Sequence, residues 1–281
     1  MSDLALVTGG AGFIGSHLVE RLLADGARVR VLDNFSTGAR ANLGFAPRFR
    51  RQLEVLRGDI RTLSVVLRAA RGARVIFHQA AMRSVPRSVK DPLGANANNV
   101  NGTLNVLEAA RRCRVPRVVY ASSSSVYGDR PDLPKREDQS PAPVSPYAAS
   151  KAAGEQYAAI WTRLYGVETV GLRYFNVFGP RQDPKSEYAA VIPRFILWGL
   201  SRRPLEIHGD GTQSRDFTYI DNVVEANILA ATAPAAPGEV FNVGCGSRVS
   251  LLEIVATLDH VAPPSVDRAN RIPPPTASQT T

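Results

Sequence analysis

Cysteine and long apolar runs are scarce in this sequence, and each shortage excludes a class of protein. The 281 residues include only two cysteines, Cys113 and Cys245, which lie far apart with no other cysteine and no histidine nearby. A disulfide scaffold and a zinc site are therefore excluded, and we predict no bound metal. No run of about 18 apolar residues occurs, which excludes a membrane helix.

The first residues show no secretory signal. Met1-Ser2-Asp3 leads straight into the apolar stretch 4–7, with no basic region before it and no small-residue cleavage site after it. Together with the low cysteine content, this predicts a cytoplasmic protein.

Lysine is scarce as well, although the net charge is +9. Four of the 34 basic residues are lysines and the other 30 are arginines, nine of which fall between Arg40 and Arg74. A basic patch would fit nucleic acid, an anionic membrane or a phosphorylated substrate. Because these arginines are spread over predicted helices and loops without interleaved aromatic residues, we interpret the charge as arginine-rich composition. We expect neither a nucleic-acid partner nor a membrane partner.

Short apolar runs alternate with helical patterns over most of the chain. The runs that predict strands are residues 4–8, 28–33, 53–58, 75–78, 117–122 and 169–173. Helical patterns cover residues 13–24 and about 92–112, and begin near Thr62 and Tyr147. Continuous Val, Ile and Leu strands separated by helices predict an α/β fold, a Rossmann-type doubly wound parallel sheet covered on both faces.

The alternation loosens after Arg173, which predicts a second and smaller lobe. We place a larger domain at residues 1–175 and a smaller lobe at 176–260, with a partly discontinuous boundary. The last stretch, 262–281, has five prolines and almost no large apolar side chains. Such a composition buries little surface, so we expect a disordered tail over 261–281.

A glycine-rich turn with Gly9, Gly12 and Gly15 lies between the first predicted strand and the first predicted helix. Glycines there let the backbone approach a pyrophosphate, which rests on the N-terminus of the helix. Asp33 ends the second predicted strand, 18 residues after Gly15. A carboxylate at this position accepts a hydrogen bond from a ribose 2′-hydroxyl and repels a 2′-phosphate, so the pattern predicts NAD rather than NADP.

The spacing GxxGxxG, with Phe13 and Ile14 inside it, resembles the extended short-chain dehydrogenase/reductases, among them the NAD-dependent nucleotide-sugar epimerases and dehydratases. The segment 33–38 is similar to their ribose loop, 58–60 to their adenine contact, and 78–81 to the stretch beneath the nicotinamide ribose. The resemblance implies NAD contacts by Gly9, Gly12, Phe13, Ile14, Gly15, Asp33, Asn34, Gly38, Asp59, Ile60, Gln79, Ala80, Ala81, Asn99, Tyr147, Lys151 and Phe175.

Tyr147 and Lys151 are four residues apart in a predicted helix, which places both side chains on one face. A lysine one turn from a tyrosine favours the phenolate and lowers the pKa of the tyrosine, as a general base requires. In the family, a serine or threonine four residues before the tyrosine of Val-Tyr-Gly, here Tyr127, bonds the reacting hydroxyl. The resemblance thus implies a catalytic triad of Ser123, Tyr147 and Lys151.

The two residues after Ser123 narrow the reaction within the family. Related 4,6-dehydratases carry an Asp-Glu pair there and a decarboxylase also needs a carboxylate, whereas this chain has Ser124 and Ser125. Epimerisation at C4 needs neither group: the base takes the proton from O4 while hydride leaves C4 for NAD⁺. The transient 4-keto sugar turns over and hydride returns to its other face. The resemblance therefore implies an NAD-dependent C4 epimerase of a UDP-sugar.

The segments after residue 172 resemble the nucleotide-sugar lobe of the family. By this resemblance Asn176 holds a phosphate or sugar oxygen, and Val191 and Ile192 lie against uracil. Arg215 neutralises the pyrophosphate, a role that suits a guanidinium because it grips phosphate oxygens through two parallel hydrogen bonds.

The sugar end looks closest to one subgroup, the epimerases of UDP-N-acetylglucosamine and its uronate, used for bacterial surface polysaccharides or the cell envelope. UDP-glucose stays open as a third substrate. In that likeness Arg83 and Ser84 face the sugar together with Ser123. Our hypothesis is that Arg83 tolerates or prefers a carboxylate on the substrate.

The resemblance ends near residue 260. The family continues with a Gly-Asp-Val-Arg-type segment that clamps the pyrophosphate, and nothing in residues 259–281 matches it. We therefore expect an incomplete lobe, and a second interpretation stays open: a truncated, catalytically weak NAD-binding protein of the same fold. The helices of the family's homodimer interface fall within 91–165, so a homodimer is expected.

Overall fold

The alternating apolar runs build a seven-stranded parallel sheet with the strand order β11-β6-β5-β4-β1-β2-β3. Its strands are β1 (Leu4–Thr8), β2 (Arg28–Asp33), β3 (Leu53–Arg57), β4 (Ala73–His78), β5 (Arg117–Ser123), β6 (Glu168–Tyr174) and β11 (Val240–Val243). The structure is a computed structural model that describes residues 3–184, 190–201, 203–261 and 270–272. The predicted Rossmann-type α/β fold is confirmed.

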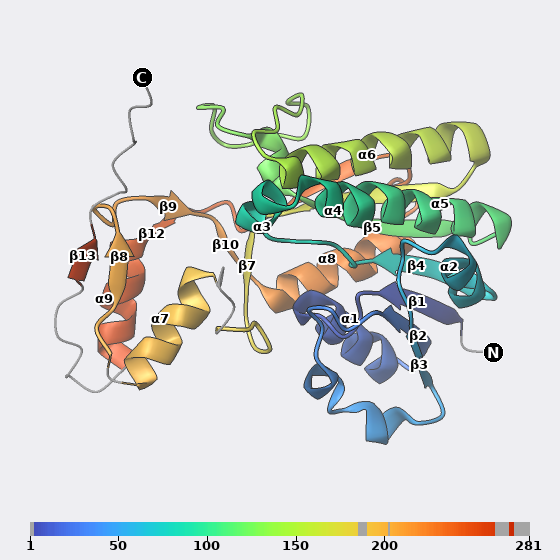
Figure 1. Ribbon diagram of the computed structural model, residues 1–281, viewed down its shortest axis with the longest axis horizontal. Coiled ribbons are helices and arrows are strands. Elements are labelled where there is room, and N and C mark those ends of the chain that lie inside the picture. The colour runs from blue at the N-terminus through green and yellow to red at the C-terminus, as the bar shows by residue number, and fades with distance from the viewer. Residues whose placement is uncertain (1–2, 185–189, 202, 262–269, 273–281) are drawn as a thin grey trace. The chain divides into compact units, whose positions relative to one another are not determined.

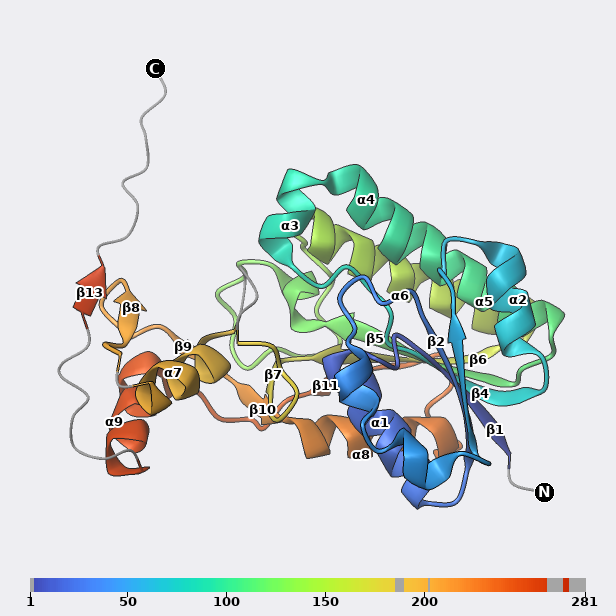
Figure 2. The same ribbon diagram turned by 60° about the horizontal axis from the view of Figure 1, so that its bottom comes forward.

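Helices cover both faces of the sheet, as a parallel sheet requires. They are α1 (Phe13–Ala24), α2 (Leu63–Ala70), α3 (Val85–Lys90), α4 (Pro92–Asn96), α5 (Gly102–Arg112), α6 (Pro146–Tyr165) and α8 (Ile220–Thr232). Helices α2, α5 and α6 lie on one face, with α3 and α4 against α6, and α1 and α8 lie together on the other (Figure 1). Figure 2 shows the same two layers from a second direction. Short turns complete this part: η1 (Arg40–Leu43), η2 (Ala46–Phe49), η3 (Ala97–Asn101) and η4 (Ser124–Tyr127).

The core of this sheet is made of apolar side chains from the strands and from the inner faces of the helices. Leu6, Ile76 and Val118 are fully buried on neighbouring strands, and Val106 of α5 packs in the same cluster. The strand order reverses between β1 and β4, which sends their loops to opposite faces of the sheet. In open α/β sheets, ligands bind at the carboxyl ends of the strands at this point.

The chain divides into two compact units. Unit 1 contains Met1–Phe175 and Tyr219–Val243, and unit 2 contains Asn176–Thr218 and Gly244–Thr281. Unit 1 therefore includes α8 and β11, because β11 pairs with β6 at the edge of the sheet. From the sequence alone, these residues had been placed in the second lobe.

Unit 2 is small and its sheet pairings are short. It has helices α7 (Val191–Leu200) and α9 (Leu251–Val261). Three two-stranded pairs accompany them: β7 (Asn176–Phe178) with β10 (Phe217–Tyr219), β9 (Ser214–Arg215) with β12 (Val249–Ser250), and β8 (Glu206–His208) with β13 (Asn270–Ile272). Phe195, Leu205 and Ile207 form its buried core.

Two details differ from the expectations drawn from the sequence. The helix expected over residues 92–112 consists of α4, the π-helical turn η3 and α5 in succession. Strand β13 falls within 261–281, the range expected to lack structure, and it pairs in parallel with β8. The rest of that tail, 262–269 and 273–281, lies outside the described residues.

Candidate active site

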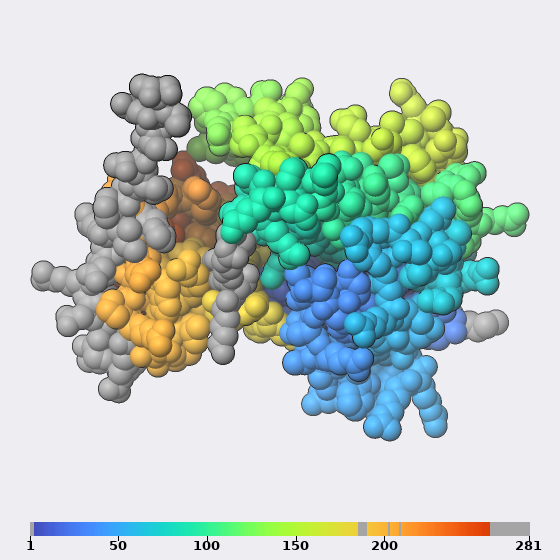
Figure 3. Space-filling view, in the orientation of Figure 1, coloured from blue at the N-terminus to red at the C-terminus, as the bar shows by residue number. Residues whose placement is uncertain are grey.

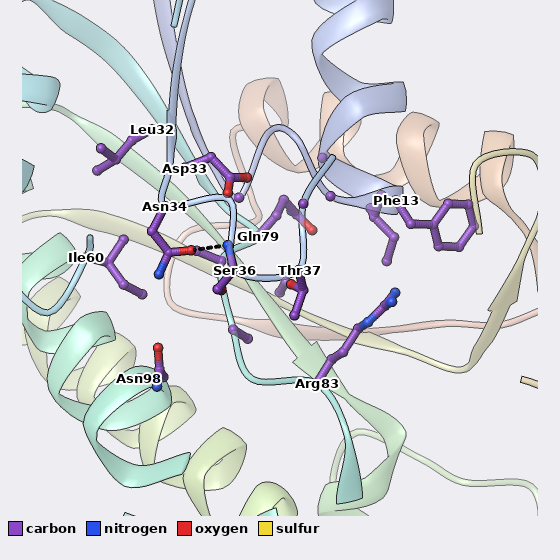
Figure 4. A pocket seen from close by; sticks show the side chains of 18 of the residues that line it. Phe13, Leu32, Asp33, Asn34, Ser36, Thr37, Ile60, Gln79, Arg83 and Asn98 are labelled. Atoms are coloured by element: carbon purple, nitrogen blue, oxygen red, sulfur yellow. Dashed lines mark hydrogen bonds between the residues drawn. The ribbon is translucent and has the colours of Figure 1, made fainter. Parts of the chain in front are cut away.

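A cavity of about 160 Å³ opens in unit 1 at the carboxyl ends of the strands. Figure 4 shows the side chains around it, including Phe13, Asp33, Ile60 and Gln79, which come from separate segments of the chain. All the predicted cofactor residues line this cavity except Asp59, Asn99 and Phe175. The fold thus brings together residues that are far apart in the sequence.

The glycine turn between β1 and α1 forms one wall of the cavity. Gly9 has a φ of +70°, and a Cβ there would lie 2.7 Å from the backbone nitrogen of Ala80. A Cβ on Gly15 would overlap the carbonyl oxygen of Gly9. Gly12 is the N-cap of α1 and has no side chain to cap the first turn, which leaves those N–H groups to a ligand. The turn is shaped for the close approach of an anion.

Asp33, at the end of β2, forms hydrogen bonds with the backbone of two loops beside the cavity. Its Oδ2 accepts a hydrogen bond from the backbone N–H of Ala11 at 2.9 Å, and its Oδ1 accepts one from Phe35 at 2.8 Å. In the same loop the backbone N–H of Ser36 donates to Asn34, the bond drawn in Figure 4. The carboxylate is therefore buried and fixed in orientation beside the cavity.

The remaining predicted cofactor residues lie outside the cavity lining. Asp59 accepts hydrogen bonds from Asn34 and Arg61, and the Arg61 guanidinium lowers the pKa of its carboxyl to about 2. Asn99 is buried on η3, where it bonds the backbone of Met82 and the hydroxyl of Ser150. The backbone N–H of Phe175 donates to Val243.

Tyr147 lies in the first turn of α6, a helix with well-defined ends. The hydroxyl of Ser145 caps it by accepting the N–H of Ala148 at 3.1 Å, and Pro146 occupies the first turn. The N–H of Tyr147 donates to the hydroxyl of Ser88 on α3 at 3.0 Å. The tyrosine is thereby held at the cavity.

Lys151 is buried one turn further along α6. Its Nζ donates to the carbonyl oxygen of Ala121 on β5 at 2.7 Å and lies 6.0 Å from the ring centroid of Tyr147. Ser123 ends β5, and its Oγ accepts hydrogen bonds from the backbone N–H and the hydroxyl of Ser125. The hydroxyl of Ser123 also acts on Tyr147, whose pKa it lowers. The structure thus brings the three predicted catalytic residues together.

The pKa of Tyr147 is set by groups other than the one expected. Burial raises it above 10, while the hydrogen bond with Ser123 and the charge of Arg83 pull it down by less. Lys151 had been expected to lower it. Instead, burial lowers the pKa of Lys151 itself to about 7, because an ammonium is costly inside the protein.

Unit 2 holds a second cavity, of about 360 Å³. Asn176, Val191, Ile192 and Arg215 all line it, as do Phe178 and other apolar residues. Asn176 donates through its backbone and its side chain to the carbonyl oxygen of Asp216. Arg215 is exposed, and its guanidinium donates to the carbonyl oxygen of Ser214. These four residues, predicted to bind the nucleotide, therefore share one cavity.

Arg83 and Ser84 belong to unit 1 and differ in their surroundings. Arg83 is exposed, lines the first cavity and acts through its charge on Tyr147. Ser84 is the N-cap of α3 and accepts the N–H of Arg87 at 3.2 Å. The structure therefore gives Ser84 a capping role that its sequence position had not indicated.

Comparison with known proteins identifies the family of this chain. Residues 5–244 match the NAD dependent epimerase/dehydratase family. The chain belongs to this family. It is 45% identical to the UDP-glucose 4-epimerase of Mycolicibacterium smegmatis over 89% of this chain and 79% of that protein.

Two solved structures are also similar to this member of the family. A UDP-N-acetylglucosamine 4-epimerase from Methanobrevibacter ruminantium M1, in complex with UDP-N-acetylmuramic acid, has a TM-score of 0.92 and 39% identity, covering 98% of this chain and 87% of that one. A UDP-glucose 4-epimerase from Thermus thermophilus, in complex with NAD, has a TM-score of 0.86 and 39% identity, covering 97% and 87%.

The cofactor of this epimerase/dehydratase family member is NAD, and its residues fit that molecule. The glycine turn leaves a cradle that a Cβ would fill, next to an uncapped helix N-terminus suited to a pyrophosphate. Asp33 places a carboxylate at the end of β2, where a ribose diol needs an acceptor. Across the residues that the structure describes, no group of three His, Cys, Asp or Glu side chains could hold a metal ion.

Sequence reasoning missed several residues of the first cavity: Leu32, Ser36, Thr37, Gly58, Asn98, Ala121, Ser122 and Tyr174. Some of them lie inside motifs already recognised, such as Ser36 in the ribose loop. Ala121, Ser122 and Tyr174 sit at the carboxyl ends of β5 and β6, a position that itself predicts ligand contact in such sheets.

Among the helices that the structure describes, none combines the length and the apolar composition that a membrane span needs.

Proposed function

We propose that this protein is an NAD-dependent C4 epimerase of a UDP-sugar. The observation that carries the proposal is the meeting of Tyr147 and the buried Lys151 at the cavity that fits NAD, with Ser123 lowering the pKa of Tyr147. The relatives named above, a UDP-glucose and a UDP-N-acetylglucosamine 4-epimerase, support it. The proposal keeps the cytoplasmic location expected from the sequence and a role in surface polysaccharide or cell-envelope biosynthesis.

The chemistry assigned to each side chain follows from its surroundings. When bound, NAD accepts a hydride from C4 of the sugar and returns it to the opposite face. Tyr147 takes the proton from O4 and gives it back, with Ser123 hydrogen-bonded to the same oxygen. Burial raises the pKa of Tyr147 and favours the phenol, whereas Ser123 and Arg83 lower that pKa, the direction that a general base requires. The product between the two transfers is a 4-keto sugar that turns over in the site.

The surroundings of Ser123 argue against elimination. Ser124 and Ser125 follow it in η4, and the hydroxyl of Ser125 donates to Ser123 at 2.9 Å. Neither side chain is an acid or a base that would expel a hydroxyl group as water. The residues present therefore favour epimerisation over dehydration.

The cofactor roles proposed for unit 1 follow its cavity. The N-terminus of α1 with Gly9, Gly12 and Gly15 would hold the pyrophosphate of NAD, and Asp33 would accept from the adenosine ribose. Lys151 and Tyr147 would contact the nicotinamide ribose. Asn99 would act indirectly, because its hydrogen bonds hold the backbone of Met82 in place.

The nucleotide of the substrate is assigned to residues of unit 2. Val191 and Ile192 begin α7 and offer apolar contact to a uracil ring, while Arg215 and Asn176 offer a guanidinium and an amide to phosphate oxygens. The sugar is assigned to Ser123, Ser84 and Arg83. Because Arg83 is a cation at the cavity whose charge reaches Tyr147, we propose that it selects a sugar with a carboxylate, the uronate of UDP-N-acetylglucosamine.

A homodimer through the helices within 91–165 is part of the proposal. Large apolar side chains are exposed on helices of unit 1: Val85 and Val89 on α3, Leu93 on α4, and Ile160 and Leu164 on α6. Leu93 is 83% exposed, which is unfavourable in water and favourable at an interface. The helices α3 to α5 form the teal surface of unit 1 in Figure 3.

The deciding experiment incubates the purified protein with UDP-N-acetylglucosamine, its uronate and UDP-glucose in separate reactions without added reductant. The C4 epimer of at least one should form, and Tyr147→Phe serves as the inactive control. Tightly retained NAD with no conversion of any of the three would support the alternative, a catalytically weak NAD-binding protein.

Arg83→Ala tests the sugar preference separately. The variant should lose rate on the uronate and keep its rate on the neutral sugars. Unchanged selectivity between the uronate and the neutral sugars would sink the role of Arg83 and leave the epimerase proposal standing.

A further inference from the structure

Glu155 is a buried carboxylate one turn after Lys151 on α6. Positions four apart on a helix lie on one side, so Tyr147, Lys151 and Glu155 follow each other along the face of α6 that covers β5 and β6. Lys151 is 3% exposed and Glu155 is 5% exposed. A buried carboxylate beside a buried ammonium acts at short range and with little screening by water.

The carboxylate is fixed from two strands. The Nε and Nη2 of Arg173 on β6 donate to its two oxygens at 2.9 and 2.8 Å, a bidentate ion pair. The hydroxyl of Ser122 on β5 donates to the same carboxylate. Ser122 directly precedes Ser123, so Glu155 joins the helix that carries Tyr147 and Lys151 to the strand end that carries Ser123.

The third guanidinium nitrogen of Arg173, Nη1, also has a hydrogen-bond partner. It donates to the hydroxyl of Tyr127 at 2.8 Å, and that hydroxyl donates to Asn242 on β11 at 2.7 Å. A polar group with every partner in place is rigid, whereas one left unpaired in the interior is costly. Glu155 is therefore held in place by its partners.

Among the residues that the structure describes, the other groups around Lys151 bring no further negative charge. On β5, the ring centroid of Tyr120 lies 5.0 Å from its Nζ, and the carbonyl oxygen of Ala121 accepts its hydrogen bond. His78 on β4 is neutral, because burial lowers its pKa to about 3. Arg173 is paired with Glu155, and Arg83 acts on Tyr147. Burial lowers the pKa of Lys151, and Glu155 is the group that raises it.

We propose that Glu155 is a positioning residue for the reaction, whose buried charge favours the ammonium form of Lys151 and whose bond from Ser122 fixes the strand end beside Ser123. The inference rests on the proposed function for its consequence in catalysis. The charge relation itself belongs to the chain and is measurable without a substrate. Without the carboxylate, burial would act alone and the pKa of Lys151 would be lower.

The experiment titrates Lys151 directly in the NAD-loaded protein. The chain has four lysines, so protein labelled with ¹³C at lysine Cε gives few signals, and Lys151→Arg identifies the buried one. The double variant Glu155→Met/Arg173→Met removes both charges at similar volume, a change that folded proteins tolerate. Glu155→Gln/Arg173→Gln removes the same charges and keeps hydrogen-bonding groups.

The titration midpoint of Lys151 should fall in both double variants, because they remove the carboxylate that raises its pKa, while Arg173, removed with it, is not a group that shifts that pKa. The matched control, Arg117→Gln/Glu168→Gln, removes an ion pair that joins β5 to β6 at the other end of these strands, and should leave the midpoint unchanged. An unchanged midpoint in the Glu155 variants would overturn the proposal.

Catalysis supplies the second readout. In the epimerase assay, the double variants should lower kcat with KM unchanged, and the limb of the kcat profile that follows Lys151 should move down by the same amount as the lysine midpoint. A lower kcat with no movement of either limb or midpoint would show a merely structural role and overturn the proposal. If the wild type converts no UDP-sugar, the proposed function fails while the lysine titration still decides the role of Glu155.

Discussion

The two units build their cavities in different ways. In unit 1 the cavity is lined by backbone at a glycine turn and by side chains fixed by buried partners, such as Lys151 on the carbonyl oxygen of Ala121. In unit 2 the cavity is lined by apolar side chains and by Arg215, which is exposed. From this difference we expect changes in the two units to have different effects. Substitutions near the proposed reacting groups of unit 1 should lower the rate, and substitutions at the cavity of unit 2 should lower the affinity for the nucleotide.

The hydrophobic cores of the two units also differ, in their size. Unit 1 buries a large cluster between its sheet and α2 and α5, including Leu6, Ile76 and Leu107. In unit 2, Phe195, Leu205 and Ile207 are fully buried, and partly buried residues of α7 and α9 pack around them. A small core depends more on each of its members. The four predictions below test this comparison, from the largest expected effect to the smallest.

Tyr147→Phe should lower kcat for epimerisation by about 10²–10⁴-fold, because it removes the group that moves the O4 proton. NAD content and UDP binding should stay at wild-type levels, since the ring remains in α6 and unit 2 is untouched. Product analysis by chromatography and NAD release on denaturation measure both. A variant with more than about a tenth of the wild-type rate would assign the base elsewhere.

Phe195→Ala should destabilise unit 2 by about 3–5 kcal/mol, because it empties the centre of a small core. NAD retention by unit 1 should persist while UDP binding is lost. Each unit contains one tryptophan, Trp161 in unit 1 and Trp198 in unit 2, so Trp161→Phe protein reports unfolding of unit 2 by fluorescence.

The matched control is Ile196→Ala, next to Phe195 on α7 and 44% exposed, which should cost less than about 0.5 kcal/mol. Loss of NAD in Phe195→Ala would show that the two units depend on each other for folding.

Arg215→Ala should weaken UDP binding by roughly tenfold to a hundredfold, the value of one charge-assisted hydrogen bond of about 1.5–3 kcal/mol. Stability should not change, because the side chain is exposed. Titration calorimetry with UDP measures the effect, and Arg203→Ala, an exposed arginine of unit 2 outside the cavity lining, is the control. Equal losses in both variants would mean that net charge, rather than Arg215, attracts the nucleotide.

Glu108→Gln should cost less than about 1 kcal/mol, because the carboxylate pairs with Arg111 and Arg112 on the surface of α5. These arginines lower the pKa of Glu108 from 4.5 to about 2. The folded state therefore binds the proton less tightly than the unfolded state, so the contribution is present above pH 4.5 and is lost as pH falls towards 2. Urea unfolding at about pH 6 and about pH 3 should show a smaller difference between variant and wild type at the lower pH.

Local pattern predicted much of unit 1. The bounds of β1, α1 and β2 agree with the sequence to the residue, because each follows from a short apolar period between turn residues. The glycine turn and Asp33 were predicted for the same reason: strand, turn and helix are consecutive. The sequence did not predict that α8 and β11 belong to unit 1. Their membership depends on the pairing of β11 with β6, which lies far earlier in the chain, and local patterns do not show such a pairing.

By itself, the sequence determined the parallel α/β sheet and the glycine turn, because these depend on local periods and spacings. The assignment of Ser123, Tyr147 and Lys151 came from the resemblance to the family. The tertiary structure alone decided what surrounds them. It buried Lys151 against β5, brought Arg173 of β6 to Glu155 of α6, and made Ser123 and Arg83 the groups that lower the pKa of Tyr147. Charge and burial act through space, and the distances that set them exist only once the chain has folded.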